Sequence, residues 1–162
     1  MNIKELIAQH ILDVHEGDNW TESNIKNALA DVTLSEAITK TPASPNTIAT
    51  LLHHLTYWNK IMVERINGVT SAIPETNGHE MIPLITEVDW EQLKADNSFS
   101  AHELASAIRN FDETKLLHPI IPGYSTVYKN LQGSSEHIHY HLGQIIILKN
   151  LIRSLKAQQF TH

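Results

Sequence analysis

Apolar residues recur every three or four positions along most of this 162-residue chain, as they do on the buried face of an amphipathic helix. The first run contains Ile3, Ile7 and Ile11 and predicts a helix over about residues 2–15. No stretch alternates apolar and polar residues for long enough to indicate a strand. The pattern therefore favours an all-α protein.

Residues that start or stop helices divide the rest of the chain. Beyond the first helix, the sequence predicts helices over about 22–30, 33–40, 45–67, from about 89 onward, 100–117 and 131–157. Ser44 and Ser100 are expected to be N-caps, and Gly68 marks a helix end. The segments 69–88 and 118–128 contain Pro and Gly and are expected to be loops. The expected fold is a four-helix bundle with short extra helices and a long loop between its second and third long helices.

Composition limits the function classes. Lys and Arg number 12 against 18 Asp and Glu, and no basic cluster offers a footprint for nucleic acid or anionic lipid. Cysteine is absent, which excludes a disulfide scaffold, a thiolate metal site and a cysteine nucleophile. The longest apolar run, 145–148, is far shorter than the roughly 20 residues of a membrane span. Because the first residues also lack an apolar signal core, we expect a cytoplasmic protein with one domain over 1–162.

Histidine is unusually frequent, at 11 residues of 162. It is the commonest metal ligand and the side chain best suited to proton exchange near neutral pH. On a helix that advances about 100° per residue, His137 and His141 lie about 40° apart on the apolar face, and Gln144 also points inward. Two histidines four positions apart can share one metal ion. The alternative is two core histidines, each bonded to a carbonyl or carboxylate.

A second pair of histidines lies on the helix expected over 45–67. His54 lies on the flank of the apolar stripe and can face into the bundle, whereas His53 lies opposite the core. His139 is likewise expected on the far side of its helix, away from the core. Three inward-facing imidazoles from two helices would bind a divalent ion and leave its other coordination positions open to water or substrate, as in catalytic sites. His10 is a weaker candidate, better suited to the edge of the core or to a pocket wall than to metal binding.

The tryptophans are assigned structural roles. Trp20, Trp58 and Trp90 are expected to anchor packing, and Trp58 can also line a pocket beside the histidines. The chain contains no glycine-rich phosphate loop, no Gly-x-Ser-x-Gly elbow and no His-Glu-x-x-His motif. The candidate chemistry therefore depends on the histidines.

Two runs of the sequence resemble the DinB-like (YfiT-like) family of bacterial four-helix metalloproteins: residues 46–58, NTIATLLHHLTYW, and residues 137–145, HIHYHLGQI. The family pattern has one histidine in the second helix, followed by Leu and an aromatic pair, and a His-x-x-Tyr-His-x-Gly-Gln run in the fourth. Matched residue by residue, the resemblance implies the metal ligands His54, His137 and His141. These are the same three histidines that the helical positions select.

The resemblance also implies a function. Members of the DinB-like family are often homodimers with a divalent metal such as Ni or Zn, and some use the metal to activate a low-molecular-weight thiol for S-transfer. We therefore expect a metal-dependent enzyme that acts on a small-molecule substrate with such a thiol. Two alternatives stay open: a metal-dependent hydrolase that uses bound hydroxide, and a non-enzymatic stress protein that binds a metal or small ligand.

Overall fold

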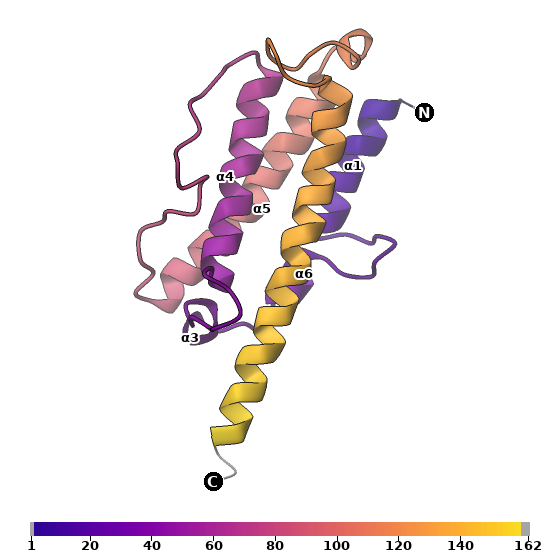
Figure 1. The fold of residues 1–162 in the computed structure, drawn as a ribbon. Helices are drawn as coiled ribbons and strands as arrows, with labels where there is room; N and C mark the ends of the chain where they lie inside the picture. Colours follow the sequence, from indigo (N-terminus) through magenta and orange to yellow (C-terminus); the bar gives the residue numbers. More distant parts are fainter. Residues whose placement is uncertain (1, 160–162) are drawn as a thin grey trace.

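Four long helices form the body of the protein in the computed structural model, which describes residues 2–159 (Figure 1). They are α1 (Ile3–His15), α4 (Ile48–Ile66), α5 (Glu87–Asn110) and α6 (Val127–Gln159). Short α2 (Ile25–Leu29) and α3 (Leu34–Ala37) connect α1 to α4, and the 3-10 helix η1 (Glu113–Lys115) follows α5. Residues 2–159 contain no β-strand. The predicted all-α bundle, with its long loop between α4 and α5, is confirmed.

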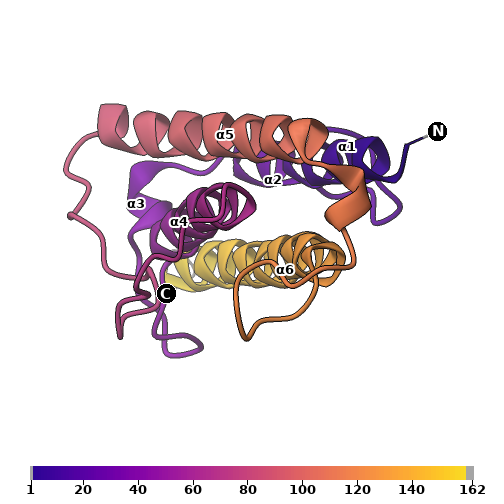
Figure 2. The same cartoon turned by 90° about the horizontal axis from the view of Figure 1, so that it is seen from above.

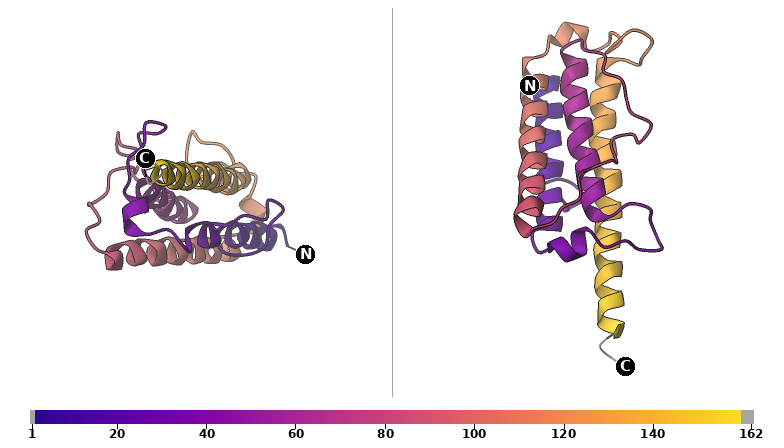
Figure 3. Two further views of the ribbon diagram at one scale, coloured as in Figure 1. Left: turned by 90° about the horizontal axis from the view of Figure 1, so that it is seen from below. Right: turned by 90° about the vertical axis from the view of Figure 1, so that its left-hand side faces the viewer.

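The long helices are arranged in two layers, α1 with α5 and α4 with α6 (Figure 2). Helix α5 packs on both α1 and α4, and α6 packs on the same two helices from the other side. The C-terminal part of α6 extends beyond the other helices (Figure 3). None of the helices in the described part of the chain is long and apolar enough to cross a bilayer.

The core is built from the apolar faces that the helical periodicity predicts. Its largest fully buried side chains come from all four long helices and the connecting segments: Ile11, Leu29, Ile48, Leu51, Leu52, Leu55, Trp90, Leu104, Ile108, Leu131, Ile138 and Ile145. Trp90 is an anchor, as predicted, and its Nε1 donates to Val32 O at 2.7 Å. This bond fixes the α2–α3 connection to α5.

The prediction for Trp20 is wrong, because its side chain is 97% exposed. Trp20 lies in a turn that is stabilised by polar contacts instead. Asn19 Oδ1 accepts from Thr21 N at 3.0 Å, and Asn19 Nδ2 donates to Ser23 O at 2.8 Å. The turn therefore forms without burial of the indole ring.

Two predicted N-caps are also wrong. Thr47, not Ser44, caps α4, and it forms a reciprocal capping box with Thr50. Ser100 lies inside α5, where its hydroxyl donates to Asn97 O at 2.8 Å. Since residues 87–110 contain no Gly or Pro, the helices predicted from about 89 and over 100–117 are one continuous helix that ends at Asn110.

Helix α6 is longer than the 131–157 expected from the apolar pattern. It begins at Val127, directly after Thr126, whose Oγ1 accepts from Lys129 N at 3.2 Å. This cap lies five residues before Leu131, where the apolar pattern predicted the start of the helix. The difference adds one turn to the wall of the pocket described below.

A chain of hydrogen bonds crosses the core between α1, α4 and α5. His15 Nδ1 lies 3.1 Å from Asn97 Oδ1, and His15 Nε2 lies 3.3 Å from Asn59 Nδ2. Asn97 also donates to Thr56 Oγ1, and Asn59 also donates to Ser100 Oγ, both at 3.1 Å. All five side chains are buried. Burial is the main effect that lowers the pKa of His15 to about 4, so the ring is neutral at physiological pH.

We expect the protein to lose stability on acidification between about pH 6.5 and pH 4, partly through His15. The unfolded chain takes up the proton near pH 6.5, whereas folded His15 does so only near pH 4. The free energy of unfolding should therefore fall across this window, and His15 should contribute about 3 kcal/mol of the fall. Urea titrations at several pH values measure it.

The matched control is His15→Gln, which keeps a polar side chain but does not titrate. Its free energy of unfolding should depend less steeply on pH than that of the wild type. Equal slopes for the two proteins between pH 4 and 6.5 would contradict the role given to His15.

Candidate metal centre

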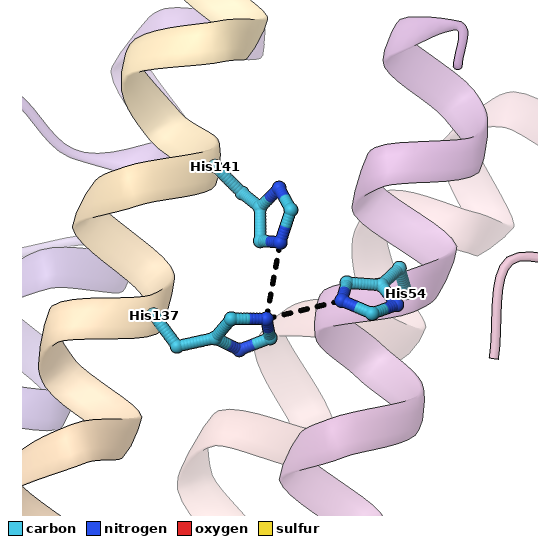
Figure 4. Close-up of side chains that lie close together, drawn as sticks. All are labelled: His54, His137 and His141. Atoms are coloured by element: carbon cyan, nitrogen blue, oxygen red, sulfur yellow. Dashed lines mark hydrogen bonds between the residues drawn. The ribbon is translucent and has the colours of Figure 1, made fainter. Parts of the chain in front are cut away.

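The structure brings the three sequence-predicted ligands together between α4 and α6. His54 Nε2 and His141 Nε2 each lie 3.0 Å from His137 Nε2 (Figure 4). All three ligand nitrogens lie within 4.8 Å of one another. Two imidazole nitrogens on one zinc ion, each about 2.0–2.1 Å from it, lie roughly 3 Å apart. The cluster is therefore a group of three histidines that could bind a metal ion.

Hydrogen bonds at the opposite ring nitrogens fix the protonation of two of these rings. His54 Nδ1 lies 2.8 Å from Asn77 O, and a carbonyl only accepts, so this nitrogen carries the proton. His141 Nδ1 donates in the same way to Gln144 Oε1 at 2.7 Å. The Nε2 atoms of His54 and His141 consequently present lone pairs toward the centre of the cluster.

The donor set fits a cation better than it fits the protein alone. The lone pairs of His54 and His141 both face His137 Nε2, which can donate at most one hydrogen. One lone pair would then be left without a partner in a largely buried site. A divalent ion would satisfy all three nitrogens at once.

The rings stay neutral at physiological pH. Burial, with further contributions from the neighbouring imidazoles, lowers the pKa of His54 to about 3 and that of His137 to about 4. Burial also lowers the pKa of His141, although the bond to Gln144 opposes this. Neutral imidazole is the form that binds metal.

A fourth histidine, not predicted from the sequence, lies at the site. His79, in the loop 67–86, stacks on His54 with ring centroids 3.9 Å apart and planes 3° from parallel. Its Nδ1 is buried without a hydrogen-bond partner. A loop residue has no helical phase, so periodicity gives no indication of where its ring points. The only signal was a histidine next to a glycine in the long loop.

The loop approaches α4 closely because Gly78 permits it. Gly78 has a φ of +76°, and a Cβ atom there would lie 2.6 Å from Tyr57 Cγ. Only glycine combines this backbone conformation with such a close approach. The same contact places Asn77 O on His54 and the His79 ring against it.

The histidines predicted to face away from the core do not join the cluster, but they are only partly exposed. His53 is half-buried beside the loop, and this burial is the main effect that lowers its pKa. His139 Nδ1 lies 3.0 Å from Ser135 O, and its ring is 5.8 Å from that of His10. Both positions were expected to face away from the core because the helical positions were considered for each helix alone. In the structure, His10 of α1 lies beside His139, and the loop covers His53.

A cavity of about 320 Å³ adjoins the cluster. Its walls include His137 and the apolar groups of Trp58, Met62 and Ile138, together with polar residues such as Asn59. Trp58 is therefore a pocket residue, as the sequence suggested. A small molecule in this cavity would lie directly beside the imidazole ring of His137.

Comparison with known proteins gives one finding. A sequence model described as the DinB superfamily matches residues 19–145, a span that contains all three clustered histidines. No curated protein and no solved structure matches the chain significantly.

Proposed function

This chain belongs to the DinB superfamily, and from that premise we propose that it is a metal-dependent enzyme in which His54, His137 and His141 bind one divalent ion, Ni or Zn. The observation that carries the proposal is the arrangement of the ring nitrogens. Two rings have their Nε2 lone pairs fixed by Asn77 O and Gln144 Oε1, and both face the third ring. Such acceptors at the second ring nitrogen are typical of histidines that bind metal.

We further propose that the reaction is S-transfer from a low-molecular-weight thiol. The ion would lower the pKa of a thiol, which would then be largely ionised near neutral pH. The chain has no cysteine, so the thiol must come from outside. The cavity beside His137 supplies apolar walls for a small electrophile and keeps water from much of its surface.

The proposal includes a cytoplasmic homodimer. The family resemblance implies the dimer, and the absence of cysteine fits a reducing compartment. The small-molecule substrate would lie beside the metal-bound thiol, because His137 is both a proposed ligand and part of the cavity wall.

The test is turnover of 1-chloro-2,4-dinitrobenzene with glutathione, bacillithiol or mycothiol, before and after metal removal. In the reaction a C–S bond forms, the C–Cl bond breaks, and chloride and the thiol proton pass to solvent. We expect turnover with at least one thiol and its loss on chelation. No metal-dependent turnover with any thiol would reject the S-transfer proposal.

Other outcomes identify the alternatives. Ester or amide hydrolysis without added thiol, abolished by a chelator, would indicate a hydrolase. Metal binding, together with stabilisation of the fold by a small ligand but no turnover, would indicate a binding protein.

A further inference from the structure

Asn59 connects the buried hydrogen-bond chain to the cavity beside the histidines. It lies on α4, its side chain is only 3% exposed, and it lines the cavity together with Trp58 and His137. The same side chain contacts His15 and Ser100 on the opposite side, toward α1 and α5. Its amide group therefore has one end in the core and one end at the cavity.

Two backbone carbonyls, Leu52 O and Asn97 O, determine which atom donates in each core hydrogen bond. Thr56 Oγ1 donates to Leu52 O at 2.9 Å, so it must accept from Asn97 Nδ2. Asn97 Oδ1 then faces His15 Nδ1, which must carry a proton. Because His15 is neutral, its Nε2 has a lone pair and accepts from Asn59.

Both hydrogens of the Asn59 amide are used in the core. Nδ2 donates to His15 Nε2 and to Ser100 Oγ, and the Ser100 hydroxyl cannot donate back because it already donates to Asn97 O. The opposite atom, Asn59 Oδ1, has no donor among residues 2–159.

Asn59 Oδ1 is also not sealed inside the protein. The fully buried side-chain polar atoms without a partner in the described chain belong to other residues, namely Thr41, Trp58, His79, Ser135 and His139. Since Asn59 lines the cavity, the accessible part of its amide is the oxygen that the core leaves free.

We propose that Asn59 is a specificity-determining residue whose Oδ1 is a fixed acceptor for an O–H or N–H group of the ligand. The ligand class is a small molecule with an apolar body and one such donor, because Trp58, Met62 and Ile138 form the apolar walls. The part of this inference that concerns a substrate rests on the proposed function, whereas the acceptor itself requires no metal. His15 and Ser100 act as positioning residues, since they determine which end of the amide faces the ligand.

The orientation is tested by nitrogen-15 NMR of metal-free wild-type protein at pH 7. We expect His15 as the neutral tautomer with the proton on Nδ1 and none on Nε2. A proton on Nε2 would require Asn59 to present its oxygen to the core and its NH₂ group to the cavity, which would overturn the proposal. This measurement needs no variant, so it holds even if a substitution at Asn59 prevents folding.

Ligand preference is tested with phenol and anisole, which differ in that only phenol can donate. Binding is followed on the methyl groups of Met62 and Ile138 in metal-free protein. We expect phenol to bind about 3- to 10-fold more tightly than anisole, as one extra hydrogen bond allows. Asn59→Leu should abolish this preference, and Asn150→Leu, the same change at an exposed position of α6, should keep it.

Equal affinities for phenol and anisole in the wild type, or an unchanged preference in Asn59→Leu, would overturn the proposal. Failure of the proposed function would be detected in other measurements, as no metal in elemental analysis or no turnover in the thiol assay. Neither of those results alters the metal-free comparison.

Discussion

Replacement of His137 by alanine is expected to lower the affinity for Zn or Ni by about 100-fold or more, because loss of a ligand should exceed the 10- to 100-fold cost of losing a supporting contact. His137 Nε2 is the central atom of the cluster, 3.0 Å from each of the other two ligand nitrogens. Without it, the remaining two imidazoles cannot surround an ion from three sides. Elemental analysis of protein purified without a nickel column should find about one ion per wild-type chain and almost none in the variant.

The matched control is His139→Ala, on the same helix two residues further along. His139 bonds to Ser135 O and has no contact with the cluster, so this variant should keep its ion. Retention of a full equivalent of metal by His137→Ala would show that the three histidines are not the binding site.

The second large effect is expected for Gly78→Ala. The new Cβ would lie 2.6 Å from Tyr57 Cγ, and the backbone has a φ of +76°. The loop is easier to displace than α4, so it should move away and remove Asn77 O from His54 Nδ1. Loss of that acceptor is expected to lower metal affinity about 10- to 100-fold, measured by competition with a chromophoric chelator.

Gly68→Ala separates backbone strain from the contact with Tyr57. Gly68 has a nearly identical φ of +78°, but a Cβ atom there would meet nothing within 4 Å. We expect a loss of stability of about 1 kcal/mol and unchanged metal affinity. If Gly78→Ala and Gly68→Ala bind metal equally well, the loop does not support the cluster.

Helical phase accounts for what the sequence could predict about the site. His137, His141 and Gln144 lie at i, i+4 and i+7 of one helix, so their positions follow from regular geometry. His54 follows from the apolar stripe of α4 in the same way. Asn77 and His79 belong to the long loop, whose path depends on the close approach of Gly78 to Tyr57 and has no periodic signal.

The wrong helix boundaries have a different cause. Ser100 has the local sequence of an N-cap, but its hydroxyl bonds to Asn97 O and to the amide of Asn59, a tertiary contact that the local pattern does not contain. Thr47 is the N-cap of α4 in place of Ser44, because it forms a capping box with Thr50. In both cases the residue type was suitable for a cap, and the surroundings decided its role.

The contacts of Asn59 with His15 and Ser100 would separate two properties of the protein, metal retention and ligand choice. Under the two proposals above, retention of the ion would depend on side chains of α4 and α6, whereas the choice of ligand would depend, through one amide, on His15 in α1 and Ser100 in α5. Descendants of this sequence would then acquire new substrates by substitutions deep in the opposite layer of the bundle, without any change to the proposed metal ligands. Divergence in such proteins should be sought behind the pocket as well as on its surface.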